Sequence, residues 1–302
     1  MSGIPQPRWS RRELLKSGLA LMAGAWAMKP HEVLAYNQPV LTPQPGDRDY
    51  TRWALLSDTH VAADPENRYR GFYPYLNLRE VAAQIADNLP DRIVITGDLA
   101  RLRGETNAYE NFKTLLAPVA KQRPIHLGLG NHDDREDFFR AFGSAADMAI
   151  ENKHIIAAEA GPVRLIVLDT LLRVNVATGK LGESQRSWLE TFLQACDDKP
   201  TILFLHHTLN SELLDTRPLL EIIQPVGKVK AVVYGHSHKY EFSQVAGIHL
   251  INLPATGFNL AGNQPVGWVE ARLTPKGGDF TLHAIGGDRR ADRQTQKLTW
   301  RA

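Results

Sequence analysis

Residues 232–238 read VVYGHSH: an apolar segment runs into Gly235, and His236 and His238 follow one residue apart. The unbroken apolar segment predicts a strand that is buried on both faces. A glycine permits a tight exit from such a strand. Beyond the end of the strand, two histidines one residue apart can face a single metal ion together. Taken alone, the pattern leaves a metal site and an ordinary turn both open.

Other apolar segments of the chain end in the same manner, in polar residues of the types that bind metals. The endings are residues 57–60 (SDTH), 97–98 (GD), 128–133 (GLGNHD) and 206–207 (HH). Each ending by itself is more often a turn than a site. So many in one domain are hard to explain by packing, because buried imidazoles and carboxylates are costly unless they are paired or bound to a metal. Since open α/β sheets place their sites at the carboxyl ends of strands, the endings predict one common site.

The body of the chain predicts a single α/β domain over residues 50–286. Short β-rich apolar segments alternate there with stretches of helical periodicity, which is typical of this class. The helical stretches are residues 78–89, 109–120, 184–195 and 211–223, and the pattern after about residue 245 is mostly strand. Residues 36–49, which contain several prolines, predict an extended lead-in, and residues 287–302 predict a charged, solvated tail.

The ligand-type residues at the strand endings are numerous enough for two metal ions. The candidates are Asp58, His60, Asp98, Asn131, His206, His236 and His238. They are too many for one tetrahedral ion. They suffice for two ions about 3.5–4 Å apart if one carboxylate bridges, which is the geometry used for displacement at phosphorus. Mixed imidazole and carboxylate ligation favours Mn, Fe or Zn, as divalent or mixed-valence ions.

With these residues in place, the chain resembles the calcineurin-like metallophosphoesterase family. The blocks of that family, D-x-H, G-D, G-N-H-D/E, H and G-H-x-H, occur here in the same order over residues 51–258. The resemblance implies a four-layer α/β/β/α sandwich with two mixed β-sheets, and a dinuclear site in which Asp98 bridges. It assigns Asp58, His60, Asp98 and His238 to one ion, and Asp98, Asn131, His206 and His236 to the other.

The same resemblance gives His132 and Asp133 catalytic roles. In the family, the histidine of G-N-H-D/E points at the substrate and stabilises or protonates the leaving oxygen. Asp133 would orient this ring by accepting a hydrogen bond from its second nitrogen. Alternatively, or in addition, Asp133 caps a helix that starts near Asp134. Of the pair His206 and His207, the family pattern favours the first as the ligand.

The activity implied by the resemblance is hydrolysis of a phosphodiester by a metal-bound hydroxide. The spacing is similar to that of bacterial cyclic-nucleotide and glycerophosphodiester phosphodiesterases, so the small phosphorylated substrate is expected to be a nucleotide, a glycerophosphodiester or a phospholipid head group. A phosphomonoesterase and a catalytically silent binding scaffold are the alternatives. Leu99, Ala100 and Arg101 follow Asp98, whereas purple acid phosphatases have a tyrosine three residues after this aspartate.

Several arginines and tyrosines follow the first two endings, and they either contact a substrate phosphate or form a solvated face. They are Arg68, Tyr69, Arg70, Tyr73, Arg101 and Arg103.

The first 35 residues predict an export signal. Residues 10–16 (SRRELLK) resemble a twin-arginine motif, and the apolar run that follows, residues 17–28, is too short to span a bilayer. The interpretation implies recognition by the twin-arginine export machinery, which transports folded proteins. It also implies a periplasmic or otherwise exported protein with no transmembrane segment in the mature chain. The alternative is an amphipathic N-terminal helix with a chance Arg-Arg pair.

The bulk composition excludes some classes of function. The formal net charge is +2 over 302 residues and no basic run is present, which disfavours a nucleic-acid scaffold held by phosphate contacts. Cys196 is the single cysteine, so an intramolecular disulfide and a multi-cysteine metal site are both excluded.

Overall fold

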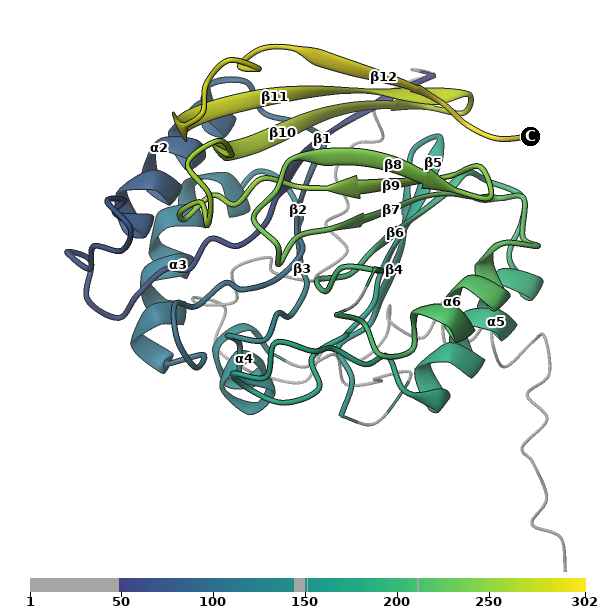
Figure 1. Ribbon diagram of the computed structural model, residues 1–302, viewed down its shortest axis with the longest axis horizontal. Coiled ribbons are helices and arrows are strands. Elements are labelled where there is room, and N and C mark those ends of the chain that lie inside the picture. The colour runs from purple at the N-terminus through teal and green to yellow at the C-terminus, as the bar shows by residue number, and fades with distance from the viewer. Residues whose placement is uncertain (1–48, 144–149, 151, 211) are drawn as a thin grey trace, which may run out of the picture.

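The computed structural model describes residues 49–143, 150, 152–210 and 212–302, and within them the strands form two six-stranded sheets (Figure 1). The first sheet has the order β12 (Thr295–Thr299), β11 (Gly277–Gly287), β10 (Pro265–Thr274), β1 (Thr51–Leu56), β2 (Arg92–Ile95) and β3 (Ile125–Leu127). The second has the order β4 (Ile156–Ala160), β5 (Val163–Val167), β6 (Thr201–Phe204), β7 (Val229–Tyr234), β9 (Ile248–Asn252) and β8 (Glu241–Val245).

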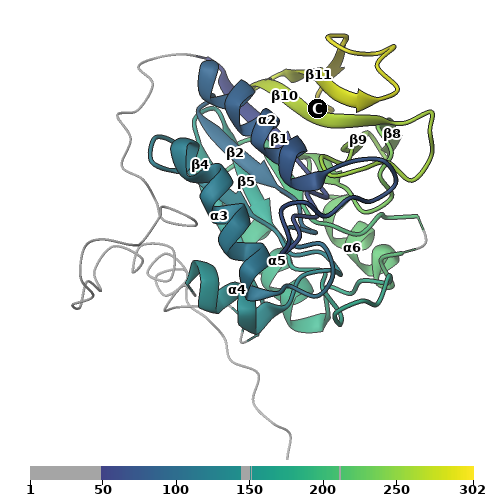
Figure 2. The ribbon, with the colours of Figure 1, turned by 90° about the vertical axis from the view of Figure 1, so that its left-hand side faces the viewer.

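Helices cover the outer face of each sheet and so complete four layers. The helices α2 (Pro74–Asp87), α3 (Thr106–Ala120) and α4 (Arg135–Phe142) lie on the first sheet, and α5 (Glu183–Ala195) and α6 (Thr216–Ile223) lie on the second (Figures 1 and 2). Each helix turns one apolar stripe inward. In α2 this stripe includes Leu78, Val81 and Ile85, which pack in the cluster between the helices and the first sheet.

An apolar core lies between the two sheets. Trp53 of β1 and Phe204 of β6 meet there with ring centroids 5.9 Å apart, and Phe280 of β11 belongs to the same cluster. Because helices cover the outer faces as well, β5 and β6 are buried along their whole length. This is the physical reason why these strands appear in the sequence as unbroken apolar segments.

The parallel strands of both sheets end at one common edge. In the first sheet β1, β2 and β3 are parallel neighbours, and in the second β5, β6, β7 and β9 are. Backbone hydrogen bonds join the loops that follow them: the amide of Thr256, after β9, donates to the carbonyl oxygen of Ser57, after β1, at 2.9 Å. The amide of Asp58 in turn donates to the carbonyl oxygen of Gly97, after β2, at 3.0 Å.

The predicted sandwich with two mixed sheets is confirmed, but the prediction of a solvated tail over residues 287–302 is wrong. Residues 295–299 form β12, which pairs antiparallel with β11. Trp300 is buried in the core between the sheets, and its indole N–H donates to the carbonyl oxygen of Thr274 at 3.0 Å. Most charged residues of this segment lie in the connection between β11 and β12, and Lys297 is exposed on the edge strand, so the composition alone does not distinguish the segment from a tail.

Most predictions for the N-terminal region concern residues outside the described ranges. The predicted signal peptide, residues 1–35, and nearly all of the predicted lead-in lie outside the described residues. In the described part of the chain, no helix has the length and apolarity needed to cross a membrane. The helix predicted over residues 211–223 begins at Thr216.

Candidate metal centre

The loops after five parallel strands bring the seven predicted ligand residues to one edge of the sandwich. Asp58 and His60 follow β1, Asp98 follows β2, Asn131 follows β3, His206 follows β6, and His236 and His238 follow β7. All of these side chains are buried except that of His236, which is partly buried. Their buried polar atoms therefore have to be satisfied by one another or by a bound group.

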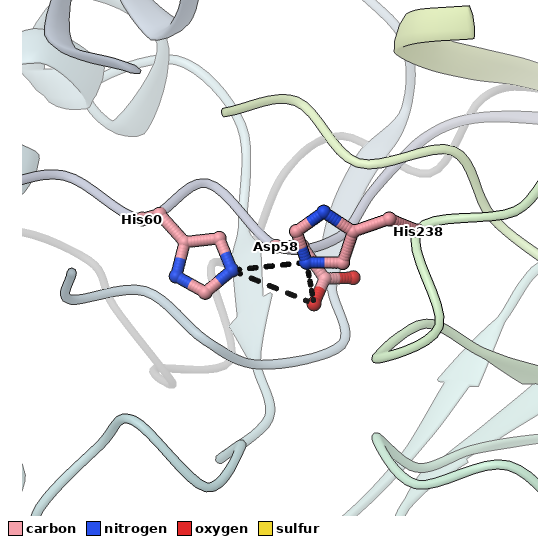
Figure 3. A group of neighbouring side chains, drawn as sticks. All are labelled: Asp58, His60 and His238. Carbon is pink, nitrogen blue, oxygen red and sulfur yellow. Dashed lines mark hydrogen bonds and ion pairs between the residues drawn. The ribbon is translucent and has the colours of Figure 1, made fainter. Parts of the chain in front are cut away.

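Asp58, His60 and His238 form one group whose polar atoms converge (Figure 3). The Nε2 atoms of the two histidines are 3.1 Å apart, and Asp58 Oδ1 lies 3.4 Å from His238 Nε2 and 3.9 Å from His60 Nε2. Ligand atoms held about 2.0–2.2 Å from one cation are about 3–3.5 Å from each other. The spacing of the group thus suits atoms that share a cation.

Asp98, His206 and His236 form a second group beside the first. Asp98 Oδ2 lies 3.3 Å from His206 Nε2 and also 3.7 Å from His60 Nε2, so this carboxylate faces both groups. The amide oxygen of Asn131 is buried and has no hydrogen-bond partner among the described residues. The fold therefore supports a dinuclear divalent metal site, with Asp98 between the two groups.

The backbone at this edge adopts conformations that L-residues avoid. Five of the seven candidate residues have positive φ: Asp58, His60, Asp98, His236 and His238, at 51°, 47°, 50°, 68° and 52°. Such a conformation costs about 1–2 kcal/mol for a residue with a side chain, and it persists where the surrounding structure enforces it for a function. Each turn sends the side chain back toward the common centre just after its strand ends.

A glycine is required at position 235 because the Ser57–Asp58 loop approaches it closely, and not because of its φ angle. A Cβ atom built on it would lie 1.7 Å from Ser57 Oγ and 2.4 Å from Asp58 Oδ2. The exit of β7 therefore passes directly against the loop that follows β1, which places His236 and His238 against Asp58.

Burial and mutual charge set the protonation of the cluster. Burial would raise the pKa of Asp58, but His238 and His206 beside it hold that pKa below 3.8. Burial would lower the pKa of His206, but Asp98 and Asp58 raise it to about 9. Burial lowers the pKa of His60 to about 3. The carboxylates are ionised at pH 7, and a cation that binds between them would displace the proton of His206.

Outer contacts hold the side chains in place. The carbonyl oxygen of Phe258 lies 2.6 Å from His238 Nδ1, which leaves Nε2 facing the centre. Asp58 Oδ2 accepts from Ser57 Oγ at 2.5 Å and from the amide of His236 at 3.0 Å, so its other oxygen is left for the centre. Asp58 Oδ1 has no hydrogen-bond partner among the described residues. Such partners are what orient ligands in metal sites.

The structure places His206 in the second group, whereas His207 belongs to neither group and packs against the ring of His236, with centroids 4.8 Å apart. The ring nitrogen Nδ1 of His207 lies 2.8 Å from Thr170 Oγ1, and burial lowers the pKa of His207 to about 2. On the outer side of His236, the carboxylate of Glu212 lies 3.8 Å from His236 Nε2 and accepts a hydrogen bond from Thr208. Glu212 belongs to none of the blocks, so the sequence did not single it out.

His132 lies beside the cluster, but Asp133 does not orient it. The ring of His132 packs edge-on to that of His60, with centroids 5.2 Å apart, and its Nδ1 lies 3.1 Å from the carbonyl oxygen of Leu102. The predicted hydrogen bond from His132 to Asp133 is wrong, because the oxygens of Asp133 accept from other donors. These donors are the amides of Leu99, Ala100 and Gly130 and the hydroxyl of Tyr109.

The helix cap predicted at Asp133 lies one residue further on. Asp134 is the N-cap of α4 and accepts from the amide of Asp137 at 3.0 Å. Asp133 instead ties the loop that carries Asp98 to the loop that carries Asn131. Burial and the charge of Asp98 raise the pKa of Asp133 to about 6, against the effect of the backbone donors.

A further residue of the site was not expected from the sequence. Phe258 follows β9, a sixth strand that ends at the same edge, and its ring stacks on His60 at 4.7 Å and lies 4.8 Å from His238. The stretch PATGF, at residues 254–258, has the same strand-end glycine as the other endings. It carries no metal-type side chain, and so it gave no sign of a role.

Known proteins share this sequence pattern and fold. A family model described as calcineurin-like phosphoesterase matches residues 51–240. The chain is 33% identical over 205 residues to a probable cyclic nucleotide phosphodiesterase of Rhodopseudomonas palustris, which covers 62% of this chain and 72% of the relative. It is 29% identical over 198 residues to a probable glycerophosphodiester phosphodiesterase of Arcobacter nitrofigilis, which covers 61% and 70%.

Among solved structures, a dimetal phosphatase from Danio rerio has a similar fold. The TM-score is 0.65 at 17% identity, with 83% of this chain and 99% of that chain covered. The family match spans the strands and loops that carry all seven candidate ligands. The chain therefore belongs to the calcineurin-like phosphoesterase family and is a metal-dependent hydrolase of phosphoric esters.

Proposed function

We propose that the protein is an exported phosphodiesterase with two transition-metal ions, acting on a nucleotide, a glycerophosphodiester or a phospholipid head group. The observation that carries the proposal is the convergence of two buried His/Asp groups that share Asp98. Relatives named as cyclic nucleotide and glycerophosphodiester phosphodiesterases favour a diester over a monoester. Export rests on the sequence of residues 1–35 alone.

The residues present fit the proposed ions. One ion would be held by Asp58, His60, Asp98 and His238, and the other by Asp98, Asn131, His206 and His236. The donor set of imidazoles, carboxylates and one amide suits Mn, Fe or Zn. When bound, two such ions lower the pKa of a water molecule and neutralise the phosphoryl oxygens as charge develops.

In this proposal, His132 holds a proton for the leaving group. Nδ1 of His132 faces the carbonyl oxygen of Leu102 at 3.1 Å. The other ring nitrogen, Nε2, would be the atom that gains or gives up a proton. The side chain is only partly buried and lies beside His60, so an ester oxygen at the centre can reach it. A positioned histidine of this kind contributes about 10²–10⁴-fold to the rate.

The experiment compares hydrolysis of bis(4-nitrophenyl) phosphate and 4-nitrophenyl phosphate by the Mn-loaded protein. The proposal expects the diester to be the better substrate and Asn131→Ala to abolish its cleavage. His132→Ala should impair cleavage of a diester with an alcohol leaving group far more than that of the nitrophenyl diester, because nitrophenolate leaves with little protonation. A preference for the monoester would assign the protein to the phosphatases instead.

The sequence also allowed a catalytically silent scaffold, which the family match and the relatives named as phosphodiesterases disfavour. Such a scaffold predicts a protein that retains no metal after gentle purification and that hydrolyses neither substrate with added Mn. The complete ligand set and the presence of His132, which a scaffold would not need, favour the enzyme.

The export component has its own test. Changing both Arg11 and Arg12 to Lys should leave the protein in the cytoplasm, because the twin-arginine pair is the feature recognised. Unchanged recovery of this variant from the periplasm would show that another route carries it.

A further inference from the structure

Arg101 is fixed directly beside the loop that carries His60. It lies three residues after Asp98, and its backbone amide donates to the carbonyl oxygen of Val61 at 2.9 Å. Ala100 and Val61 form an isolated parallel bridge at the same point. The loop after β2 and the loop after β1 therefore run side by side. These backbone contacts hold the Arg101 backbone close to the centre.

The guanidinium of Arg101 packs against two aromatic rings. Its Cζ lies 3.9 Å from the ring centroid of Tyr69 and 5.4 Å from that of Phe258. Its Nε is buried and has no hydrogen-bond partner among the described residues, and within the same residues no ion pair to Arg101 forms. Cation–π contacts stabilise such a group only partly, so an unpaired buried donor indicates a partner that arrives with a ligand.

The aromatic rings connect Arg101 to the first metal group. Phe258 is 4% exposed and lies against the rings of His60 and His238 on one side, while the ring of Tyr69 meets it edge-on at 4.7 Å. Tyr69 is 37% exposed, so the outer side of the arrangement is open to solvent. We call Tyr69, Arg101 and Phe258 the arginine subsite. It adjoins the group formed by Asp58, His60 and His238.

The position of the subsite determines which part of a substrate it can meet. Two ions bound at the centre would neutralise the phosphoryl group itself. The organic group that remains esterified must lie next to the centre, and an arginine there contributes a fixed positive charge and a fork of N–H donors. Acceptor oxygens on that group gain hydrogen bonds, whereas a cationic group is repelled.

We propose that Arg101 sets the charge selectivity of the enzyme, favouring phosphodiesters whose organic group offers acceptor oxygens over those whose organic group is cationic. This inference rests on the proposed phosphodiesterase function. For unit charges about 8 Å apart at an effective dielectric constant of about 40, the interaction corresponds to about a fivefold change in a binding constant.

The test uses two chromogenic diesters with the same leaving group, the 4-nitrophenyl ester of thymidine 5′-phosphate and 4-nitrophenyl phosphorylcholine. In the Mn-loaded protein, Arg101→Gln should lower the ratio of kcat/KM for the thymidine ester over the choline ester by at least about fivefold. Most of the change should be in KM. Arg101→Lys should keep most of the ratio, and Arg79→Gln, which removes an equal charge from the exposed side of α2, should leave it unchanged.

A binding measurement separates selectivity from turnover. Calorimetry of the Mn-loaded protein should show that Arg101→Gln binds thymidine 5′-phosphate more weakly and phosphocholine more tightly than the unchanged protein does. An unchanged ratio of kcat/KM in an active, folded Arg101→Gln variant would overturn the role of Arg101 and leave the phosphodiesterase standing. Hydrolysis of neither diester by the unchanged protein would overturn both.

Discussion

Asp133→Asn should lower the free energy of unfolding by about 2–4 kcal/mol, although it changes one oxygen atom into an amino group. Asp133 Oδ1 accepts from the amide of Ala100 and the hydroxyl of Tyr109, and Oδ2 accepts from the amide of Gly130. Asparagine has only one acceptor oxygen, so in either orientation its amino group faces a buried backbone N–H. A buried donor without an acceptor costs about 1–3 kcal/mol, and the asparagine amino group adds a second unpaired donor that faces it. We expect this cost to outweigh the relief of losing a charge that burial and Asp98 disfavour.

Urea and thermal unfolding measure this loss. For a domain of this size, about 2–4 kcal/mol lowers Tm by about 5–15 °C. Asp134→Asn is the matched control, since it removes the same charge one residue away. Asp134 caps α4, and asparagine caps a helix about as well as aspartate, so we expect a loss below about 0.5 kcal/mol.

The opposite result would restore the role that the family pattern suggests for Asp133. If Asp133→Asn unfolds at the same urea concentration as the unchanged protein while kcat falls and its pH profile shifts, then Asp133 acts on the ring of His132. The hydrogen bonds found between Asp133 and the loop amides would then contribute little to stability.

Two further predictions concern the centre and the fold around it. Gly235→Ala should weaken Mn binding in calorimetry by about tenfold or more, because its Cβ would meet Ser57 and Asp58, while Gly262→Ala, in open space, should not. Asp169→Asn should cost about 2–4 kcal/mol at pH 7, because it leaves Arg135 without its carboxylate. Burial would raise the pKa of Asp169, but Arg135 holds it below 3.8, so this stabilisation is present above an unfolded pKa of about 3.9 and is lost as the pH falls through the folded value. Urea titrations at falling pH should show the free energies of unfolding of the variant and the unchanged protein converging. A difference between them that stays constant with pH would contradict this.

The sequence predicted the fold and the ligand cluster because both depend on one simple pattern. Strands covered on both faces have to be apolar throughout, and metal-type residues such as Asp58 and His206 come directly after them. Parallel strands bring their carboxyl ends to one edge, so order along the chain was enough to predict proximity. The family resemblance, and not this pattern, assigned His132 a role other than that of a ligand, and the structure places it next to His60.

The contacts that the sequence did not predict are those in which residue type is uninformative. A carboxylate such as Asp133 can accept from an imidazole, cap a helix or join two loops, and only the arrangement of donors around it decides. Phe258 has no metal-type atom, yet its carbonyl oxygen orients His238 and its ring lies on two candidate ligands. Residues 295–299 are polar in composition, but their pairing with β11 and the burial of Trp300 make them part of the first sheet.

The geometry of the centre couples metal binding to folding. Strained φ angles at five of the seven candidate ligands and unpartnered buried atoms of Asp58, Asn131 and His206 all oppose folding when nothing is bound. A cation that binds these atoms stabilises the folded state by its binding free energy. The proposed twin-arginine route transports folded proteins, and a chain whose folded state is completed by its metals would meet that requirement only after loading. The order of events would then be metal binding, folding of the loops that follow the strands, and export.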